Sequence, residues 1–128
     1  MLKKVGVVLI AASTLVAVVV LSVIPRRLGF WVEGDGSALH FAAYLFLSTL
    51  AVWVLVLFRH RLDVAVMIAF TYVAFVGAVL EVAQVFIPTR SAETSDFAYD
   101  ILGSGVGTLL AAAGVYGQRN ANVRSITD

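Results

Sequence analysis

The chain has 128 residues, of which 61% are hydrophobic and 13% are charged, and its formal net charge is +1. Soluble domains contain roughly 45–50% apolar and 25% charged residues, so this composition excludes an ordinary soluble protein and indicates one small integral membrane domain. The small net charge gives no reason to expect a nucleic-acid partner. The absence of cysteine excludes disulfides, thiolate metal sites and cysteine nucleophiles.

Four apolar stretches are long enough to cross a bilayer, which takes about 20 helical residues. They cover residues 5–24, 39–58, 64–87 and 97–117. The connections between them are short and polar, which favours antiparallel neighbouring helices. We therefore predict an all-α membrane protein in which residues 1–117 form a compact bundle of four transmembrane helices. Residues 118–128 are expected to be a short, polar cytoplasmic tail without regular structure.

The first stretch has some features of a secretory signal, because Lys3 and Lys4 precede its apolar residues. It is longer than a typical signal core, however, and Pro25-Arg26-Arg27 follows it in place of a small-residue cleavage site. We therefore interpret it as a retained membrane span.

Basic residues predict the orientation of the bundle. With the N-terminus inside, the inner segments contain six lysine and arginine residues and the outer loops contain three. The positive-inside rule then places both termini in the cytoplasm. The inner residues are Lys3, Lys4, Arg59, Arg61, Arg119 and Arg124, and the outer ones are Arg26, Arg27 and Arg90.

Polar residues occur at the predicted outer ends of the second and third spans. His40 and Tyr44 are four residues apart, and Glu81 and Gln84 are three apart, so each pair shares one helical face. An ionisable residue within a span costs about 2.5–3.5 kcal/mol on insertion scales. Glu81 is therefore expected to be either a functional group or half of an ion pair with Arg90 or His40.

The fourth span begins with two acids on one face, Asp96 and Asp100. Asp96 also suits the N-cap of this helix, where a carboxylate meets free backbone N–H groups. The same face continues as a ridge of small residues, which lets another helix approach closely. The ridge consists of Gly103, Gly107, Ala111 and Gly114.

In this order and spacing, the polar residues resemble the VanZ-like family of small bacterial membrane proteins. The resemblance covers residues 37 to about 110. It implies a multi-pass protein of the bacterial plasma (inner) membrane that acts at the cell envelope. The family is linked to resistance to the glycopeptide antibiotic teicoplanin. The matching segments are His40-Phe41-Ala42-Ala43-Tyr44, Glu81-x-x-Gln84-x-Phe86-x-Pro88-x-Arg90, and Asp96-x-x-x-Asp100-x-x-Gly103 followed by Gly107.

Three positions depart from the family pattern. Gly36-Ser37 stands where the family often has Asp-Lys, which leaves the following histidine without a nearby lysine. Asp100 stands where asparagine is frequent and adds a negative charge near Asp96. Thr89 replaces the usual glycine between the proline and the arginine, so a less tight turn is expected there.

We expect the outer polar residues to bind a membrane lipid or a lipid-linked precursor by its headgroup. Arginine side chains suit bidentate contacts with phosphate oxygens, so Arg90, with Arg26 and Arg27, would meet a phosphate. The carboxylates would hold hydroxyls, amines or a bridging cation. The expected ligand-binding residues are Arg90, Gln84, Asp100 and Tyr44.

An enzyme is an open alternative, with Glu81, His40 and Asp96 as catalytic acid and base residues of a membrane-embedded hydrolase or transferase. The sequence contains no Gly-x-Ser-x-Gly, HExxH or phosphate-binding glycine loop. A cation variant would use His40, Glu81, Asp96 and Asp100, but their spacing is not diagnostic, and we expect no resident metal and no cofactor. Two other hypotheses for the function stay open, a structural partner subunit and a transporter. Assembly into a homo-oligomer is also open.

Overall fold

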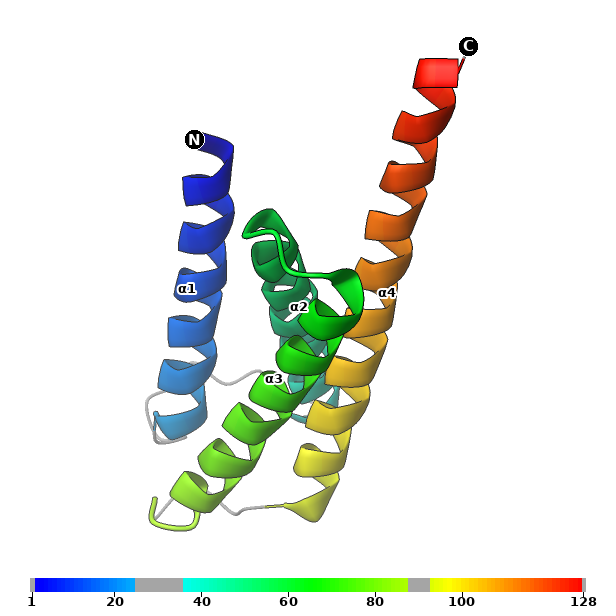
Figure 1. The fold of residues 1–128 in the computed structure, drawn as a ribbon. Coiled ribbons are helices and arrows are strands. Elements are labelled where there is room, and N and C mark those ends of the chain that lie inside the picture. Colours follow the sequence, from blue (N-terminus) through cyan, green and yellow to red (C-terminus); the bar gives the residue numbers. More distant parts are fainter. Residues whose placement is uncertain (1, 25–35, 88–92, 128) are drawn as a thin grey trace.

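A computed structural model describes residues 2–24, 36–87 and 93–127, which form four helices and the short segments next to them. They are α1 (Leu2–Val23), α2 (Gly36–Leu57), α3 (Leu62–Gln84) and α4 (Thr94–Thr127), and both termini lie at the same end of the bundle (Figure 1). Each helix is long and apolar enough to cross a membrane, and the described ranges contain no strand. The predicted all-α bundle of four spans is confirmed, and the protein is a multi-pass membrane protein.

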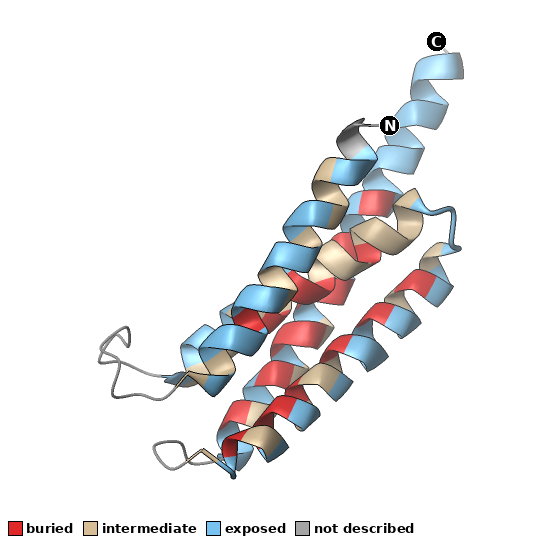
Figure 2. Ribbon diagram, turned by 90° about the vertical axis from the view of Figure 1, so that its left-hand side faces the viewer, coloured by how far each residue is buried: buried red, intermediate tan, exposed pale blue. Residues whose placement is uncertain are grey.

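The bundle is centred on α2 and α4. These two helices share the most extensive contact, α3 packs on both of them, and α1 contacts α2 and α3. Buried residues lie mainly on α2, α3 and α4, whereas α1 is exposed along most of its length (Figure 2). Val18 is the one buried residue among the described side chains of α1. Most of the apolar surface of α1 is therefore free to face lipid.

Small residues of α4 allow α2 to approach it closely. A Cβ atom added to Gly103 would meet the backbone carbonyl oxygen of Phe41, and one added to Gly107 would meet that of Leu45. Membrane helices associate without a hydrophobic driving force and depend on such close packing. The predicted ridge thus packs against α2 of the same chain. At its last position, Gly114 is exposed, and a Cβ atom there would lie 3.5 Å from Cζ2 of Trp53 on α2.

A Schellman turn ends α2. The N–H of His60 donates to the carbonyl oxygen of Leu55 over 3.2 Å, and the N–H of Arg59 donates to that of Val56 over 3.0 Å. Arg59 takes the left-handed conformation that this turn requires, with a φ of 71°. The two bonds satisfy carbonyl groups that a helix end leaves without partners. The chain can therefore reverse into α3 within a few residues.

The C-terminal helix is longer than the sequence predicted. α4 continues through the expected tail to Thr127, so the prediction that this segment lacks regular structure was wrong for residues 118–127. The segment contains no proline, and no glycine follows Gly117. An established helix gains one hydrogen bond for each residue added, so polar residues can extend it beyond the apolar part.

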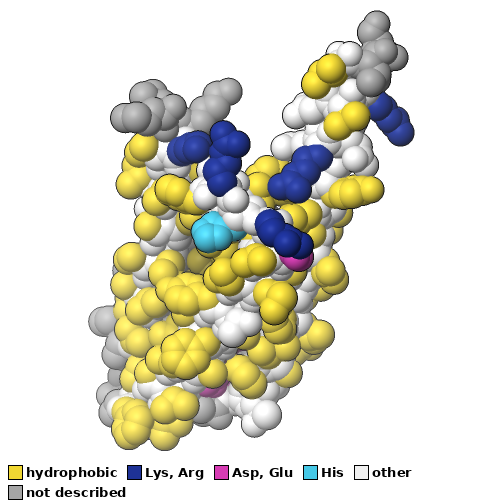
Figure 3. Space-filling model, in the orientation of Figure 1, with side chains coloured by type: hydrophobic (Ala, Val, Ile, Leu, Met, Phe, Trp, Pro, Cys, Tyr) yellow, Lys and Arg dark blue, Asp and Glu magenta, His cyan; other side chains and the backbone are white. Residues whose placement is uncertain are grey.

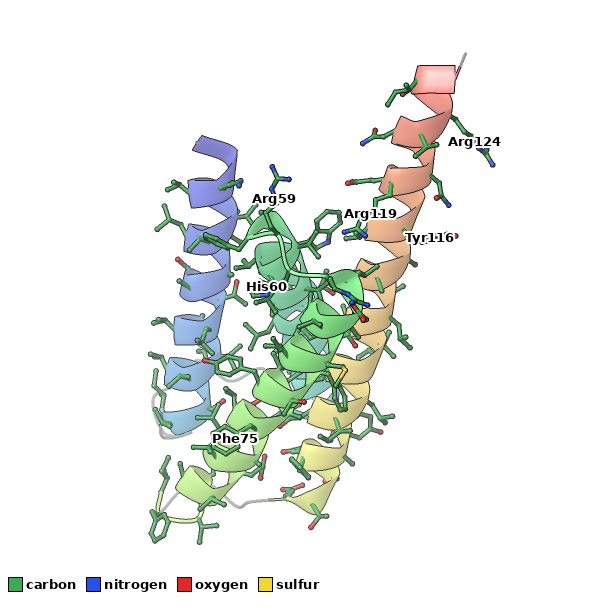
Figure 4. The ribbon with its side chains drawn as sticks, in the orientation of Figure 1. Arg59, His60, Phe75, Tyr116, Arg119 and Arg124 are labelled. Carbon is green, nitrogen blue, oxygen red and sulfur yellow. The ribbon has the colours of Figure 1, made fainter. Side chains whose placement is uncertain are left out.

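Basic side chains occupy the end of the bundle that holds the termini. This end appears in Figure 3 as a group of lysine and arginine side chains, and Figure 4 places Arg59, Arg119 and Arg124 there. The described carboxylates of Glu81, Asp96 and Asp100 belong to the opposite ends of α3 and α4. The arrangement is the one that the predicted orientation requires, because the positive-inside rule assigns the basic end to the cytoplasm and the acidic end to the outer side.

Single cysteines will report this orientation, because the chain contains none of its own. Ser95 in the first turn of α4 and Ser125 near its end are both exposed. In intact spheroplasts, we expect a membrane-impermeant maleimide to label the Ser95→Cys variant. The Ser125→Cys variant should react only after lysis. The reverse pattern would place the acidic end of the bundle in the cytoplasm.

Candidate functional site

Three helix ends meet at the end of the bundle opposite the termini, namely the start of α2, the end of α3 and the start of α4. All the predicted site residues that the structure describes lie here. Arg90 is outside the described residues, as are Arg26 and Arg27. We call the following set the polar cluster: Ser37, His40, Tyr44, Glu81, Gln84, Asp96 and Asp100.

His40 of α2 lies between two aspartates of α4. Its Nδ1 atom is 2.8 Å from Oδ1 of Asp100, and its Nε2 atom is 3.7 Å from Oδ2 of Asp96. Tyr44 lies one turn further along α2, and its ring stacks with the imidazole at a centroid distance of 6.3 Å and an interplanar angle of 5°. The imidazole is therefore held on both edges and on one face, which restricts its rotation.

Asp96 is not the predicted N-cap. Helix α4 begins at Thr94, so Asp96 lies inside its first turn, and the Asp96 backbone N–H donates to the carbonyl oxygen of Glu93 over 2.9 Å. The Asp96 carboxylate accepts a hydrogen bond from Ser37 Oγ over 3.0 Å. A carboxylate in the first turn still interacts favourably with the helix dipole. Its main contacts, however, connect α4 to the first turn of α2.

Glu81 and Gln84 both lie on the buried face of α3, as their spacing predicted. Glu81 is 8% exposed, and neither of its carboxylate oxygens has a hydrogen-bond partner among the described residues. The backbone of Glu93 interacts with this carboxylate without reaching hydrogen-bond geometry. No ion pair joins Glu81 to His40 in the part of the chain described. The other predicted partner, Arg90, lies outside it.

Three ionisable groups nevertheless converge from three helices. The three groups belong to His40, Glu81 and Asp100. Each has one side-chain nitrogen or oxygen atom that could bind a metal ion, and these three atoms lie within 4.8 Å of one another. Asp100 is 0% exposed, and its Oδ2 atom also has no hydrogen-bond partner among the described residues. A buried polar group without a partner costs roughly 1–3 kcal/mol, and more if it is charged. Stability of the bundle alone does not account for such an arrangement.

Two further buried residues of the site were not predicted. Gly77 precedes Glu81 by one turn, and a Cβ atom there would lie 2.9 Å from Oδ2 of Asp100 and 3.1 Å from Cε1 of Tyr44. Ser104 follows Asp100 by one turn and is fully buried, with no hydrogen-bond partner for its hydroxyl among the described residues. Each is four residues from an acid on the same helical face, which was the signal available in the sequence.

Apolar pockets adjoin the polar cluster. One of about 300 Å³ lies between α3 and α4, and Ala78, Glu81 and Phe97 contribute to its walls. Val82 also lines it and is 61% exposed, so the pocket borders the apolar surface of the bundle. A second pocket of about 180 Å³ lies between α1 and α2, with His40 in its wall. Polar groups and apolar space therefore meet at the same end of the molecule.

The described part of the cluster is rich in negative charge. It contains the carboxylates of Glu81, Asp96 and Asp100 and one imidazole, and the described lysine and arginine side chains lie at the other end of the bundle. Charges interact strongly at the low dielectric of a protein interior. These groups therefore favour a ligand that brings hydrogen-bond donors or positive charge.

Comparison of the chain with protein-family models, with curated proteins and with solved structures gives no match. The chemistry of the polar cluster is therefore the basis for a functional proposal.

Proposed function

We propose that this protein binds the headgroup of a membrane lipid or lipid-linked precursor at the outer face of a bacterial plasma membrane. The observation that carries the proposal is the buried Glu81 carboxylate, which has no hydrogen-bond partner among the described residues and lines an apolar pocket between α3 and α4. An amphiphile satisfies both features, because its polar part can bond the carboxylate while its chain fills apolar space.

The dimensions and position of the pocket support a lipid. Ligand pockets span roughly 300–1,000 Å³ and combine apolar walls with a few polar groups. The pocket has about 300 Å³, and Val82 and Val85 at its border are 61% and 65% exposed. In a membrane-spanning helix, such exposed apolar side chains contact acyl chains. A lipid can therefore enter sideways from the bilayer without crossing water.

The polar groups indicate what the headgroup brings. Glu81, Asp96 and Asp100 are hydrogen-bond acceptors when ionised, so they favour hydroxyl or amine donors. A phosphate in the same headgroup would need cations. In the sequence, Arg26 and Arg27 fall between α1 and α2, and Arg90 falls between α3 and α4. The VanZ-like resemblance supports the same setting, a small bacterial membrane protein that acts at the cell envelope.

Native mass spectrometry of protein extracted gently from its own membrane tests the proposal. We expect wild type to carry a defined lipid, and Ala78→Phe to lose at least about 90% of it, because the phenyl ring occupies the pocket of about 300 Å³. Arg90→Ala should also lose it if the headgroup carries phosphate. Ala113→Phe is the matched control, because it adds the same ring at an exposed position of α4.

Two results would contradict lipid binding at this pocket. One is a wild type that carries only the bulk lipid mixture of the membrane, although circular dichroism shows it to be folded. The other is an Ala78→Phe variant that retains the defined lipid to the same extent as Ala113→Phe. In the second case the bound lipid would lie elsewhere on the bundle.

A further inference from the structure

The convergence of His40, Glu81 and Asp100 points beyond lipid binding. Their ligand atoms lie within 4.8 Å of one another, and each comes from a different helix. We propose that these three side chains form a binding site for one divalent transition-metal ion. Both proposals use the Glu81 carboxylate, but the metal site needs no lipid, so protein freed of lipid tests it separately.

The Glu81 carboxylate is the observation that distinguishes a metal site from an acidic cluster. The hydrogen bond between Nδ1 of His40 and Oδ1 of Asp100, over 2.8 Å, gives these two atoms a partner without a metal. It leaves Glu81, which is 8% exposed, with no hydrogen-bond partner for either oxygen among the described residues. Buried charges are normally paired or coordinate a metal. A cation between the three groups would give Glu81 its missing partner.

The distances are compatible with coordination after small side-chain rotations. Ligand atoms about 2.1 Å from an ion such as Zn²⁺ lie roughly 3–3.5 Å from one another. The His40 Nδ1 and Asp100 Oδ1 atoms are already 2.8 Å apart, and the Glu81 carboxylate lies within 4.8 Å of both residues. The ion would replace the proton between His40 and Asp100. His40, Asp100 and Glu81 could then each bind the ion through one atom.

The surroundings of His40 match those of a metal-bound histidine. Such a ring almost always donates its second N–H to a carboxylate, a carbonyl or water, which orients it. With Nδ1 on the ion, Nε2 faces Asp96 Oδ2 at 3.7 Å. Asp96 is itself held by Ser37 Oγ at 3.0 Å, and Tyr44 stacks on the ring. In this arrangement Asp96 is an orienting residue and does not bind the metal.

The donor set selects the class of ion. One imidazole nitrogen with carboxylate oxygens suits Zn²⁺, Mn²⁺ or Fe²⁺, whereas Mg²⁺ and Ca²⁺ prefer oxygen ligands alone and Cu⁺ prefers sulfur. Two carboxylates and a neutral imidazole also balance the charge of a divalent ion. Three protein ligands leave one coordination position open. Water or a headgroup oxygen could take it, as water or substrate does in catalytic zinc sites.

The test uses the full-length protein in detergent, carrying an affinity tag without histidines, stripped of metal by a chelator and delipidated. Zn²⁺ and Mn²⁺ are titrated separately by calorimetry, and bound metal is counted by elemental analysis. We expect wild type to bind one ion per chain. Loss of a residue that only orients a metal ligand costs about 10–100-fold in affinity. We therefore expect His40→Ala, Glu81→Gln and Asp100→Asn, which change the ligands themselves, to cost about 100-fold or more each.

Matched controls come from the other end of the bundle, where His60→Ala and Asp63→Asn remove the same groups from exposed positions. Both should bind the ion as wild type does. The unfolding temperature is a second measurement, which also identifies variants that fold poorly. The ion should raise the unfolding temperature of wild type but not that of Glu81→Gln. A wild type that binds neither ion, or controls that weaken binding as much as the three ligand variants, would overturn the proposal. Lipid binding could still hold in that case, since the protein tested is lipid-free.

Discussion

Among the glycines that the structure describes, we expect substitution by alanine to destabilise the bundle most at Gly103 and Gly107. At Gly103, the added Cβ atom would meet the backbone oxygen of Phe41 and lie 3.1 Å from the backbone nitrogen of Leu45. Backbone atoms cannot rotate away as a side chain can, so α2 and α4 would have to separate. Overpacking of this kind typically costs about 1–3 kcal/mol. The better helix propensity of alanine returns at most about 1 kcal/mol.

Reversible unfolding in detergent, followed by circular dichroism, measures this loss. Gly6→Ala and Gly117→Ala are the controls, because a Cβ atom at either position has nothing within 4 Å. Both controls should be as stable as wild type or slightly more stable. If Gly103→Ala unfolds with the same free energy as Gly117→Ala, the close approach of α2 and α4 is not what holds the bundle together.

The sequence predicted the spans well because hydropathy and short polar connections depend on local composition. It also predicted the small-residue face of α4, since a helical period determines which residues share a face. It did not identify the helix that packs on that face. The choice of α2 depends on the fit between Gly103 and the Phe41 backbone, which is a contact between segments far apart in the chain.

The candidate site was predicted as a gathering of polar residues but not as a set of pairs. His40 and Asp100 meet because of the rotation of α2 and α4 about their own axes, which spacing within one helix does not determine. Ser37 was noted only as a departure from a family pattern, and it holds Asp96. Asp96 itself was misplaced as a cap because the start of α4 at Thr94 precedes the apolar run by a few residues. Helix ends are the least determined feature of a sequence.

Replacement of Glu81 by glutamine should separate stability from function. Gln is nearly isosteric with Glu, and it removes a buried charge whose oxygens have no hydrogen-bond partner among the described residues. In protein freed of lipid and metal, we expect the free energy of unfolding to stay level or rise by about 1 kcal/mol, because a buried group without partners is costly. Ligand binding should fall sharply. Residues kept for function at the expense of stability behave in this way.

Asp100→Asn gives the contrasting result, because Oδ1 of Asp100 bonds His40 over 2.8 Å. Hydrogen bonds to charged groups contribute about 1.5–3 kcal/mol, so this variant should lose about 2 kcal/mol in the same unfolding measurement. The Asp100 carboxylate is therefore expected to stabilise the bundle and the Glu81 carboxylate is not, although both are buried in the polar cluster. If Glu81→Gln proved the more damaging of the two, Glu81 would have a structural partner within the bundle or its loops. Its carboxylate would then serve to hold the fold and not to bind a ligand.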